Sequence, residues 1–221
     1  MPPQSFLGRL ETIVTFIIPD AIRLIRAGTS LWRSRPHADS DPDFVPSGSE
    51  LGSAPDRAAR DNRFSPTGVS MFYGAEDMET TFAEIDYSSC RYATVGRFQT
   101  TRDLVILDLS EVSYYPSIFD PDERDDYHAA DFLRGFAEEI ARPLVAGEDY
   151  LPTQQVVSEG IQRFTTEPVD GIRYKSAKHP DQFNYVLFFE NADCGDRGTE
   201  DEIVLQLDPD SVQVGVDLIS R

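Results

Sequence analysis

Strand-like and helix-like segments follow one another in an irregular order along this chain, and this order restricts the fold more than any other feature. Apolar or alternating runs predict strands at residues 69–73, 91–98, 104–109, 171–174, 185–190, 203–207 and 212–216. Apolar residues at helical spacing predict helices at residues 78–85, 128–144 and 152–164. Because these segments do not repeat as strand–helix–strand units, the sequence predicts an α+β fold rather than a doubly wound parallel sheet.

The N-terminal segment, residues 5–27, is amphipathic, and its apolar residues keep near-helical spacing. Pro19 interrupts this pattern, and residues 21–26 predict a second short helix that ends at Gly28. The apolar stripe indicates contact with the protein's own core, and a helix that binds a partner is the alternative. We therefore divide the chain into a helical extension, residues 1–27, and a single globular domain, residues 28–221.

A long polar stretch, residues 36–68, is rich in Pro, Gly, Ser and Asp and shows no periodicity. Loops of this length are uncommon in compact domains and tend to be functional or flexible, so we expect a loop that could act as a lid over a site. Residues 120–126 hold five acidic residues in seven positions and predict a solvated loop.

The charge of the chain limits its ligands. The formal net charge of −19 argues against nucleic acid, because phosphate binding needs clustered Lys and Arg, and it disfavours an anionic membrane surface. Cys90 and Cys194 belong to no zinc-binding pattern, so we expect no metal and two buried free thiols, with a disulfide between them as the alternative. The apolar run at residues 13–18 is too short for a signal peptide, which makes the cytoplasm the expected compartment.

The segment RFSPTGVSMFYGAEDMETTFAEI, residues 63–85, places three chemically useful side chains at spacings of ten and eleven residues. Arg63 lies in a turn with Pro and Gly, and Tyr73 ends the predicted strand. Asp77 is a candidate N-cap for the helix that follows. Glu84 lies about 120° from the apolar stripe of that helix, at 100° per residue.

Four segments of the chain occur in the order found in RES-domain proteins: LWRSR (31–35), RFSPTGVSMFYGAEDMETTFAEI (63–85), YLPTQQVVSEGIQ (150–162) and GIRYKSAKHPDQFNYVLFF (171–189). The chain therefore resembles the RES-domain family, best known from the toxins of RES–Xre toxin–antitoxin pairs. The resemblance implies an ADP-ribosyltransferase-like fold, with a mixed, split β-sheet core and flanking helices. It also implies NAD⁺ as substrate, destroyed by phosphorolysis or hydrolysis, or used for ADP-ribosyl transfer in some members.

The family's functional residues map onto named positions of this sequence. By position, Arg63 matches the arginine of the family's Gly-Arg-(Trp/Phe)-Asn turn, and Tyr73 matches the tyrosine that closes the next strand. Glu84 matches the glutamate of the family's Ala-Glu pair, and Ser176 matches the serine of its Tyr-x-Ser-Ala segment. Arg33 matches the early arginine of the family, and the neighbouring Arg35 could substitute for it.

Arginine suits the diphosphate of NAD⁺, because its planar guanidinium donates several hydrogen bonds and stays charged. Arg33, Arg35 and Arg63, with Lys175 and Lys178 as weaker candidates, would form a basic pocket on an acidic chain. Ordinary surface charge is the alternative for each of them.

The remaining candidates suit the nicotinamide riboside end of NAD⁺. Cleavage of the nicotinamide–ribose bond develops positive charge on the sugar, which a carboxylate such as Glu84 would stabilise. Tyr73 offers a ring on which nicotinamide can stack, and Ser176 offers a hydrogen bond to nicotinamide or ribose. The structural alternatives are a solvated helix face for Glu84, half-buried core for Tyr73 and a turn serine for Ser176.

Some features depart from the family's pattern. Asn62 stands where the family usually has Gly, Ser65 stands where it usually has Asn, and about 40 residues lie between Ser110 and Tyr150. An Xre-family antitoxin is the partner that the resemblance implies, and inorganic phosphate is a possible co-substrate. A non-catalytic acidic module that binds a basic partner is the alternative function, and the sequence does not indicate the oligomeric state.

Overall fold

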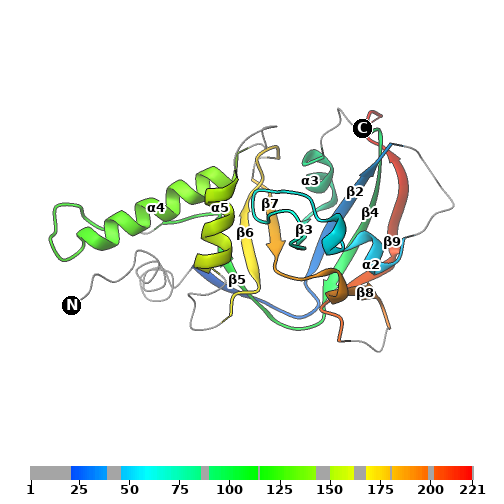
Figure 1. Cartoon of the computed structure of the whole chain (residues 1–221), viewed down its shortest axis with the longest axis horizontal. Coiled ribbons are helices and arrows are strands. Elements are labelled where there is room, and N and C mark those ends of the chain that lie inside the picture. Colours follow the sequence, from blue (N-terminus) through cyan, green and yellow to red (C-terminus); the bar gives the residue numbers. More distant parts are fainter. Residues whose placement is uncertain are drawn as a thin grey trace.

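The computed structural model of the chain (Figure 1) describes residues 21–38, 46–85, 90–113, 115–142, 150–161, 168–179, 181–198 and 202–220. Within these ranges the strands are β1 (Ile22–Ile25), β2 (Ser30–His37), β3 (Phe72–Ala75), β4 (Tyr92–Thr100), β5 (Leu104–Asp108), β6 (Gly171–Lys175), β7 (Phe183–Leu187), β8 (Cys194–Asp196) and β9 (Leu205–Asp217). The α-helices are α2 (Gly48–Leu51), α3 (Met78–Ala83), α4 (Arg124–Ile140) and α5 (Leu151–Gln155). Short 3₁₀ or π turns are η3 (Asp56–Ala58), η4 (Val156–Ile161) and η5 (Asn191–Asp193).

The described strands form one mixed sheet in the order β1-β5-β6-β7-β3-β2-β4-β9-β8. The pairs β5–β6 and β8–β9 are parallel, and the other neighbouring strands are antiparallel. This arrangement confirms the predicted α+β class. The sheet nearly divides between β2 and β3, which share one ladder pair, Trp32 with Ala75.

Helices cover one face of the sheet in two separate places. Helices α4 and α5 with η4 pack on the half of the sheet that contains β5 and β6 (Figure 1), around a buried cluster that includes Leu107, Leu133, Phe136 and Ile172. Helix α3 covers the other half through Phe82, which belongs to a second cluster. The opposite face forms a third cluster from strands of both halves, closed at one side by α2.

The predicted second helix of the N-terminal segment is wrong. Residues 22–25 form strand β1, which pairs antiparallel with β5 from Ile22–Leu107 to Ile25–Leu104. Six residues are too few to separate a helical from an extended apolar pattern, and the available edge of β5 decides in favour of a strand. Residues 5–20 lie outside the described part of the chain, so the extension over 1–27 and the division at residue 28 stay predictions.

The polar stretch 36–68 is more ordered than predicted. Strand β2 continues to His37, and the stretch also contains α2 and η3. Ser47 and Glu50 form a capping box at the start of α2, and Leu51 at its end is 1% exposed. The lid role stays a prediction, because residues 39–45 lie outside the described part.

Several element boundaries differ from the predicted ones. Strand β3 begins three residues later than predicted, α4 begins at Arg124 within the predicted acidic loop, and β7 ends at Leu187. The two predicted strands at 203–207 and 212–216 form the single strand β9, which is paired irregularly with β4. Both cysteines are free thiols, and Cys194 is buried whereas Cys90 is half-buried. Among the described residues, no helix has the length and apolar character needed to cross a membrane.

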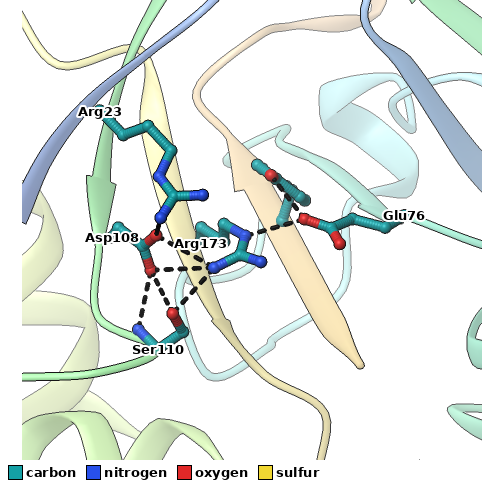
Figure 2. A network of polar contacts seen from close by, with 6 residues as sticks. Arg23, Glu76, Asp108, Ser110 and Arg173 are labelled. Atoms are coloured by element: carbon teal, nitrogen blue, oxygen red, sulfur yellow. Dashed lines mark hydrogen bonds and ion pairs between the residues drawn. The ribbon is translucent and has the colours of Figure 1, made fainter. Parts of the chain in front are cut away.

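A buried ion-pair network ties strands β1, β5 and β6 together (Figure 2). Arg173 of β6 donates from Nη1 to Asp108 Oδ2 of β5 at 3.0 Å and to Ser110 Oγ at 2.8 Å. Arg23 of β1 forms a second ion pair with Asp108 at 2.9 Å. Asp108 and Arg173 are 5% and 6% exposed, so both charges need the ion pairs of this network for compensation.

The same network reaches the start of α3. Arg173 Nε donates to Glu76 Oε1 at 2.8 Å, and Tyr185 donates its hydroxyl proton to the same oxygen at 3.0 Å. Glu76 immediately precedes Asp77, the N-cap of α3. The network therefore fixes α3 relative to β5, β6 and β7.

We expect the Asp108→Ala variant to lose about 3 kcal/mol or more of unfolding free energy, because the buried Arg173 keeps only Glu76 as a counter-charge and Arg23 and Ser110 lose their carboxylate partner. Urea denaturation measures this loss. The control is Asp131→Ala, which removes an exposed pair with Arg134 and should change stability by at most about 1 kcal/mol. An Asp108→Ala variant as stable as this control would contradict the network's role.

Candidate active site

Glu84 lies at the C-terminal end of α3, as the C-cap residue of that helix. Asp77 caps the other end by accepting a hydrogen bond from Thr80 N at 2.8 Å, as predicted. Phe82 and Ile85 are buried and hold the helix on the sheet. Glu84, off this apolar stripe, is half-buried and faces the ends of β6 and β7.

The Glu84 carboxylate is oriented through one of its two oxygens. Oε1 accepts hydrogen bonds from Ser176 Oγ at 2.6 Å and from Asn184 Nδ2 at 2.8 Å. Ser176 and Asn184 are 8% and 5% exposed, so both donors are fixed by the packing around them. Within the described part of the chain no donor is bonded to Oε2, which leaves this oxygen available to a ligand.

The Ser176 hydroxyl is fully used within the protein. Its proton goes to Glu84, and its oxygen accepts from the backbone N–H groups of Lys178 at 3.3 Å and His179 at 3.0 Å. A hydroxyl has one proton and two acceptor positions, so nothing remains for a substrate unless one of these bonds breaks. The geometry therefore points Ser176 at Glu84, whereas the resemblance implied a bond to nicotinamide or ribose.

Two tyrosines form an aromatic wall beside this carboxylate. Tyr174 of β6 is opposite Asn184 in the ladder, and Tyr73 of β3 lies on the same face of the sheet. The Phe64 ring joins them, with its centroid 5.1 Å from that of Tyr174 and 6.2 Å from that of Tyr73. Ser65 Oγ lies 3.0 Å from Tyr73 Oη, so this departure from the family's pattern supplies a partner for the tyrosine.

Both tyrosines stay neutral at physiological pH. Burial raises the pKa of Tyr73 to about 12. Burial and the nearby Glu84 carboxylate raise the pKa of Tyr174 far above its ordinary value, and the charge of Arg63 opposes this shift. Tyr174 thus lies near enough to Glu84, Tyr73 and Arg63 for each of these groups to influence its pKa.

Arg63 binds the end of a helix. Its side chain is 3% exposed, and Nη1 donates to the carbonyl oxygens of Ile140 at 2.7 Å and Arg142 at 2.5 Å, at the C-terminus of α4. Helix C-termini carry unsatisfied carbonyls and partial negative charge, which a cation stabilises. Both bonds use Nη1 of the guanidinium, and the predicted diphosphate contact of Arg63 stays a prediction.

Arg33 lies on the other face of the sheet. Trp32 shares the face of Ala75 and of the Glu84 group, and side chains alternate along a strand, so Arg33 points the opposite way. Its Nε donates to the carbonyls of Leu51 at 2.9 Å and Gly52 at 3.0 Å. Its Nη1 donates to Tyr73 O at 2.6 Å, across the gap between β2 and β3. Burial and the neighbouring Arg35 lower the pKa of Arg33 to about 10.

The position of α2 makes these arginine contacts possible. Gly48 and Gly52 lie at its two ends, and a Cβ on Gly48 would lie 2.1 Å from Gly195 O. Only glycine therefore allows α2 to approach β8 so closely. The carbonyls of Leu51 and Gly52 then face Arg33 on β2.

Arg35 keeps more of its hydrogen-bonding capacity than Arg33. Nη2 donates to Gly52 O at 3.1 Å, and burial lowers the pKa of its guanidinium. Arg35 also lines a cavity of about 520 Å³, together with His37, Glu50, Asn191 and apolar residues such as Val214. The cavity lies on the face of the sheet opposite Glu84.

The structure thus brings together Glu84, Ser176 and Tyr73 and places Arg33 and Arg35 on the opposite face of the sheet. Lys178 reaches the Glu84 carbonyl with Nζ at 3.4 Å, whereas Lys175 is exposed. Sequence reasoning missed Asn184, Tyr174 and the role of Ser65. For Asn184 a signal exists, because a lone amide in the apolar run FNYVLFF indicates a polar group at a core position.

The model of the RES domain matches residues 30–208, a range that contains every candidate residue described above. Comparisons with curated proteins and with solved structures found no match.

We expect the Arg63→Met variant to lose about 2–3 kcal/mol of unfolding free energy, because the carbonyls at the end of α4 lose a charged donor. Urea denaturation checks the value. Arg60→Met is the matched control, since Arg60 is exposed in the same stretch and should shift stability by less than about 0.5 kcal/mol. An Arg63→Met protein of unchanged stability would show that Arg63 is not a structural cap.

Proposed function

Since the chain belongs to the RES-domain family, whose fold is ADP-ribosyltransferase-like and whose members are associated with NAD and with toxin–antitoxin systems, we propose that it cleaves NAD⁺ at the nicotinamide–ribose bond. The acceptor is inorganic phosphate or water. The observation that carries this proposal is the Glu84 carboxylate, whose Oε1 is held by two donors while Oε2 remains available.

In the proposed reaction the bond between C1′ of the ribose and the nicotinamide nitrogen breaks. The electron pair goes to that nitrogen, so nicotinamide leaves as a neutral molecule and the positive charge moves to the sugar. Glu84 Oε2 accepts a hydrogen bond from a ribose hydroxyl and stabilises the developing cation, an effect that grows toward the transition state. An oxygen of phosphate or water then attacks C1′, and the proton that water loses passes to solvent.

The aromatic wall suits the leaving group. Nicotinamide is a flat ring, and Tyr73 and Tyr174 offer neutral rings beside the carboxylate. Burial raises the pKa of Tyr73 to about 12, so the tyrosine stays uncharged. A neutral tyrosine adds no negative charge that would stabilise the positive charge that nicotinamide carries before the bond breaks. Ser176 and Asn184 act on the reaction through Glu84.

In this proposal Arg35 contacts the diphosphate on the face of the sheet opposite Glu84, so the dinucleotide passes through the gap between β2 and β3. Arg33 and Arg63 are bonded to backbone carbonyls, whereas Arg35 donates one hydrogen bond and lines the 520 Å³ cavity. Arg33 keeps a positioning role, since its bond to Tyr73 O connects the two sides of the gap. The proposal also includes the acceptor, phosphate or water. It further includes the cytoplasm as the compartment and an Xre-family antitoxin as the partner.

We expect Glu84→Gln to lower the rate of nicotinamide release from NAD⁺ by about 100-fold or more, because the amide removes the negative charge that stabilises the sugar cation. Purified protein is incubated with NAD⁺, with and without phosphate, and nicotinamide is measured by chromatography. Glu79→Gln is the matched control, since Glu79 is an exposed carboxylate in the first turn of the same helix.

The outcome separates the alternatives. No nicotinamide release from folded wild-type protein, with NAD⁺ bound in a calorimetric titration, would favour a non-catalytic binding module. Release that depends on an added macromolecule, with label transferred to it, would indicate ADP-ribosyl transfer. Equal rates for Glu84→Gln and Glu79→Gln would contradict the role of Glu84.

We expect Arg35→Met to raise KM for NAD⁺ by about 10-fold or more with a smaller effect on kcat, because a charged hydrogen bond contributes equally to substrate and transition state. Steady-state kinetics measures both constants. Arg57→Met, which removes an exposed arginine in η3, is the control. An unchanged KM would remove Arg35 from the substrate site.

A further inference from the structure

The loop that follows β6 contacts both ends of helix α3. His179 Nδ1 lies 2.7 Å from Thr80 Oγ1, in the first turn of α3. Ser176 Oγ donates to Glu84 Oε1 at the C-cap of the same helix. The loop is closed on itself by the bond from Ser176 N to Gln182 O at 2.9 Å. Thus the two ends of α3 are joined through one short segment of chain.

The proton positions at the first end follow from counting donors. Thr80 Oγ1 lies 2.7 Å from Asp77 Oδ2, and an ionised carboxylate only accepts. The single hydroxyl proton of Thr80 therefore points to Asp77, and Oγ1 accepts from His179. As a result Nδ1 of His179 carries a hydrogen, which fixes the tautomer of the neutral ring.

The second end depends on the backbone of the same residue. His179 N donates to Ser176 Oγ at 3.0 Å, and Lys178 N donates to the same atom at 3.3 Å. These two bonds fill the acceptor positions of the hydroxyl, so its proton is directed at Glu84. If the His179 ring lost its anchor, the two N–H groups would move and Ser176 could turn away from Glu84.

We propose that His179 is a positioning residue for Glu84: the chain Asp77–Thr80–His179 holds the loop in the conformation in which Ser176 donates to the Glu84 carboxylate. This inference rests on the proposed function of the Glu84 site. His179 acts through Ser176 and does not touch the reacting atoms. No other side chain of the described loop reaches the first turn of α3.

The kinetic test compares two substitutions of the same residue. We expect His179→Ala to lower kcat for NAD⁺ cleavage by about 10- to 100-fold with little change in KM, because Glu84 is misplaced rather than removed. His179→Asn keeps an N–H donor at nearly the position of Nδ1 and should restore kcat to within about threefold of wild type. His128→Ala, an exposed histidine on α4, is the control and should behave as wild type.

A second pair of variants tests the same chain from the helix side. Thr80→Val keeps the shape of a fully buried residue but removes the acceptor for His179, so kcat should fall as in His179→Ala. Thr80→Ser keeps the hydroxyl and should retain activity. Thermal unfolding is recorded for each variant, and the comparison uses those with wild-type melting temperatures. Wild-type kcat in both His179→Ala and Thr80→Val would overturn the proposal.

A readout that needs no activity keeps this inference separate from the proposed function. Nitrogen-15 NMR of the wild-type ring should show hydrogen on Nδ1 of neutral His179. The amide protons of Lys178 and His179 should exchange slowly in wild type and His179→Asn, and faster in His179→Ala. Hydrogen on Nε2, or equal exchange in all three proteins, would overturn the anchoring even if NAD⁺ is cleaved. If these NMR results are obtained but NAD⁺ is not cleaved, the proposed function is refuted while the anchoring of the loop by His179 stands.

Discussion

The two hydrogen bonds that Glu84 Oε1 accepts join a short helix to two strands of the sheet, and the candidate site depends on them. A six-residue helix has little stability of its own, so its direction is set by what its ends contact. At the first end, Glu76 lies in the buried network of Arg173 and Asp108. At the second end, Ser176 and Asn184 hold the carboxylate. The position of one charged oxygen therefore follows from the packing of β5, β6 and β7.

The arginines show how the same residue type can serve the fold or a ligand. Arg33 lies where β2 and β3 separate. There its side chain donates to Tyr73 O, in place of a backbone hydrogen bond between the two strands. Arg63 performs the corresponding task at the end of α4. A buried guanidinium needs compensation, and backbone carbonyls accept hydrogen bonds from it in both cases. Of Arg33, Arg35 and Arg63, Arg35 donates one hydrogen bond within the described part of the chain and has a cavity beside it, so the fold engages it least.

Much of the fold and part of the site could be predicted from the sequence. The Asp77 cap and the stripe of Phe82 and Ile85 are local signals, and they placed Glu84 off the packed face as observed. The resemblance placed Ser176 within reach of Glu84. The contacts of Arg63 could not be predicted, because its partners lie 77 and 79 residues away on the end of another helix. Likewise, β1 forms because the edge of β5 is open to it, which no pattern within residues 22–25 reveals.

The polar groups that the described part of the fold leaves unused can be compared with the charge distribution of the proposed substrate. The Ser176 hydroxyl donates its proton to Glu84 and accepts two backbone hydrogen bonds, all within the chain. Arg33 and Arg63 donate to backbone carbonyls. What remains on one face of the sheet is an anionic oxygen of Glu84 beside neutral rings, and on the opposite face a partly used guanidinium of Arg35, so a ligand that reaches both would have to pass through the gap between β2 and β3. A ligand that satisfies both groups carries hydroxyl donors or positive charge at one end and negative charge at the other. A dinucleotide with a cationic nicotinamide riboside and a diphosphate has this distribution of charge, and a purely anionic ligand does not.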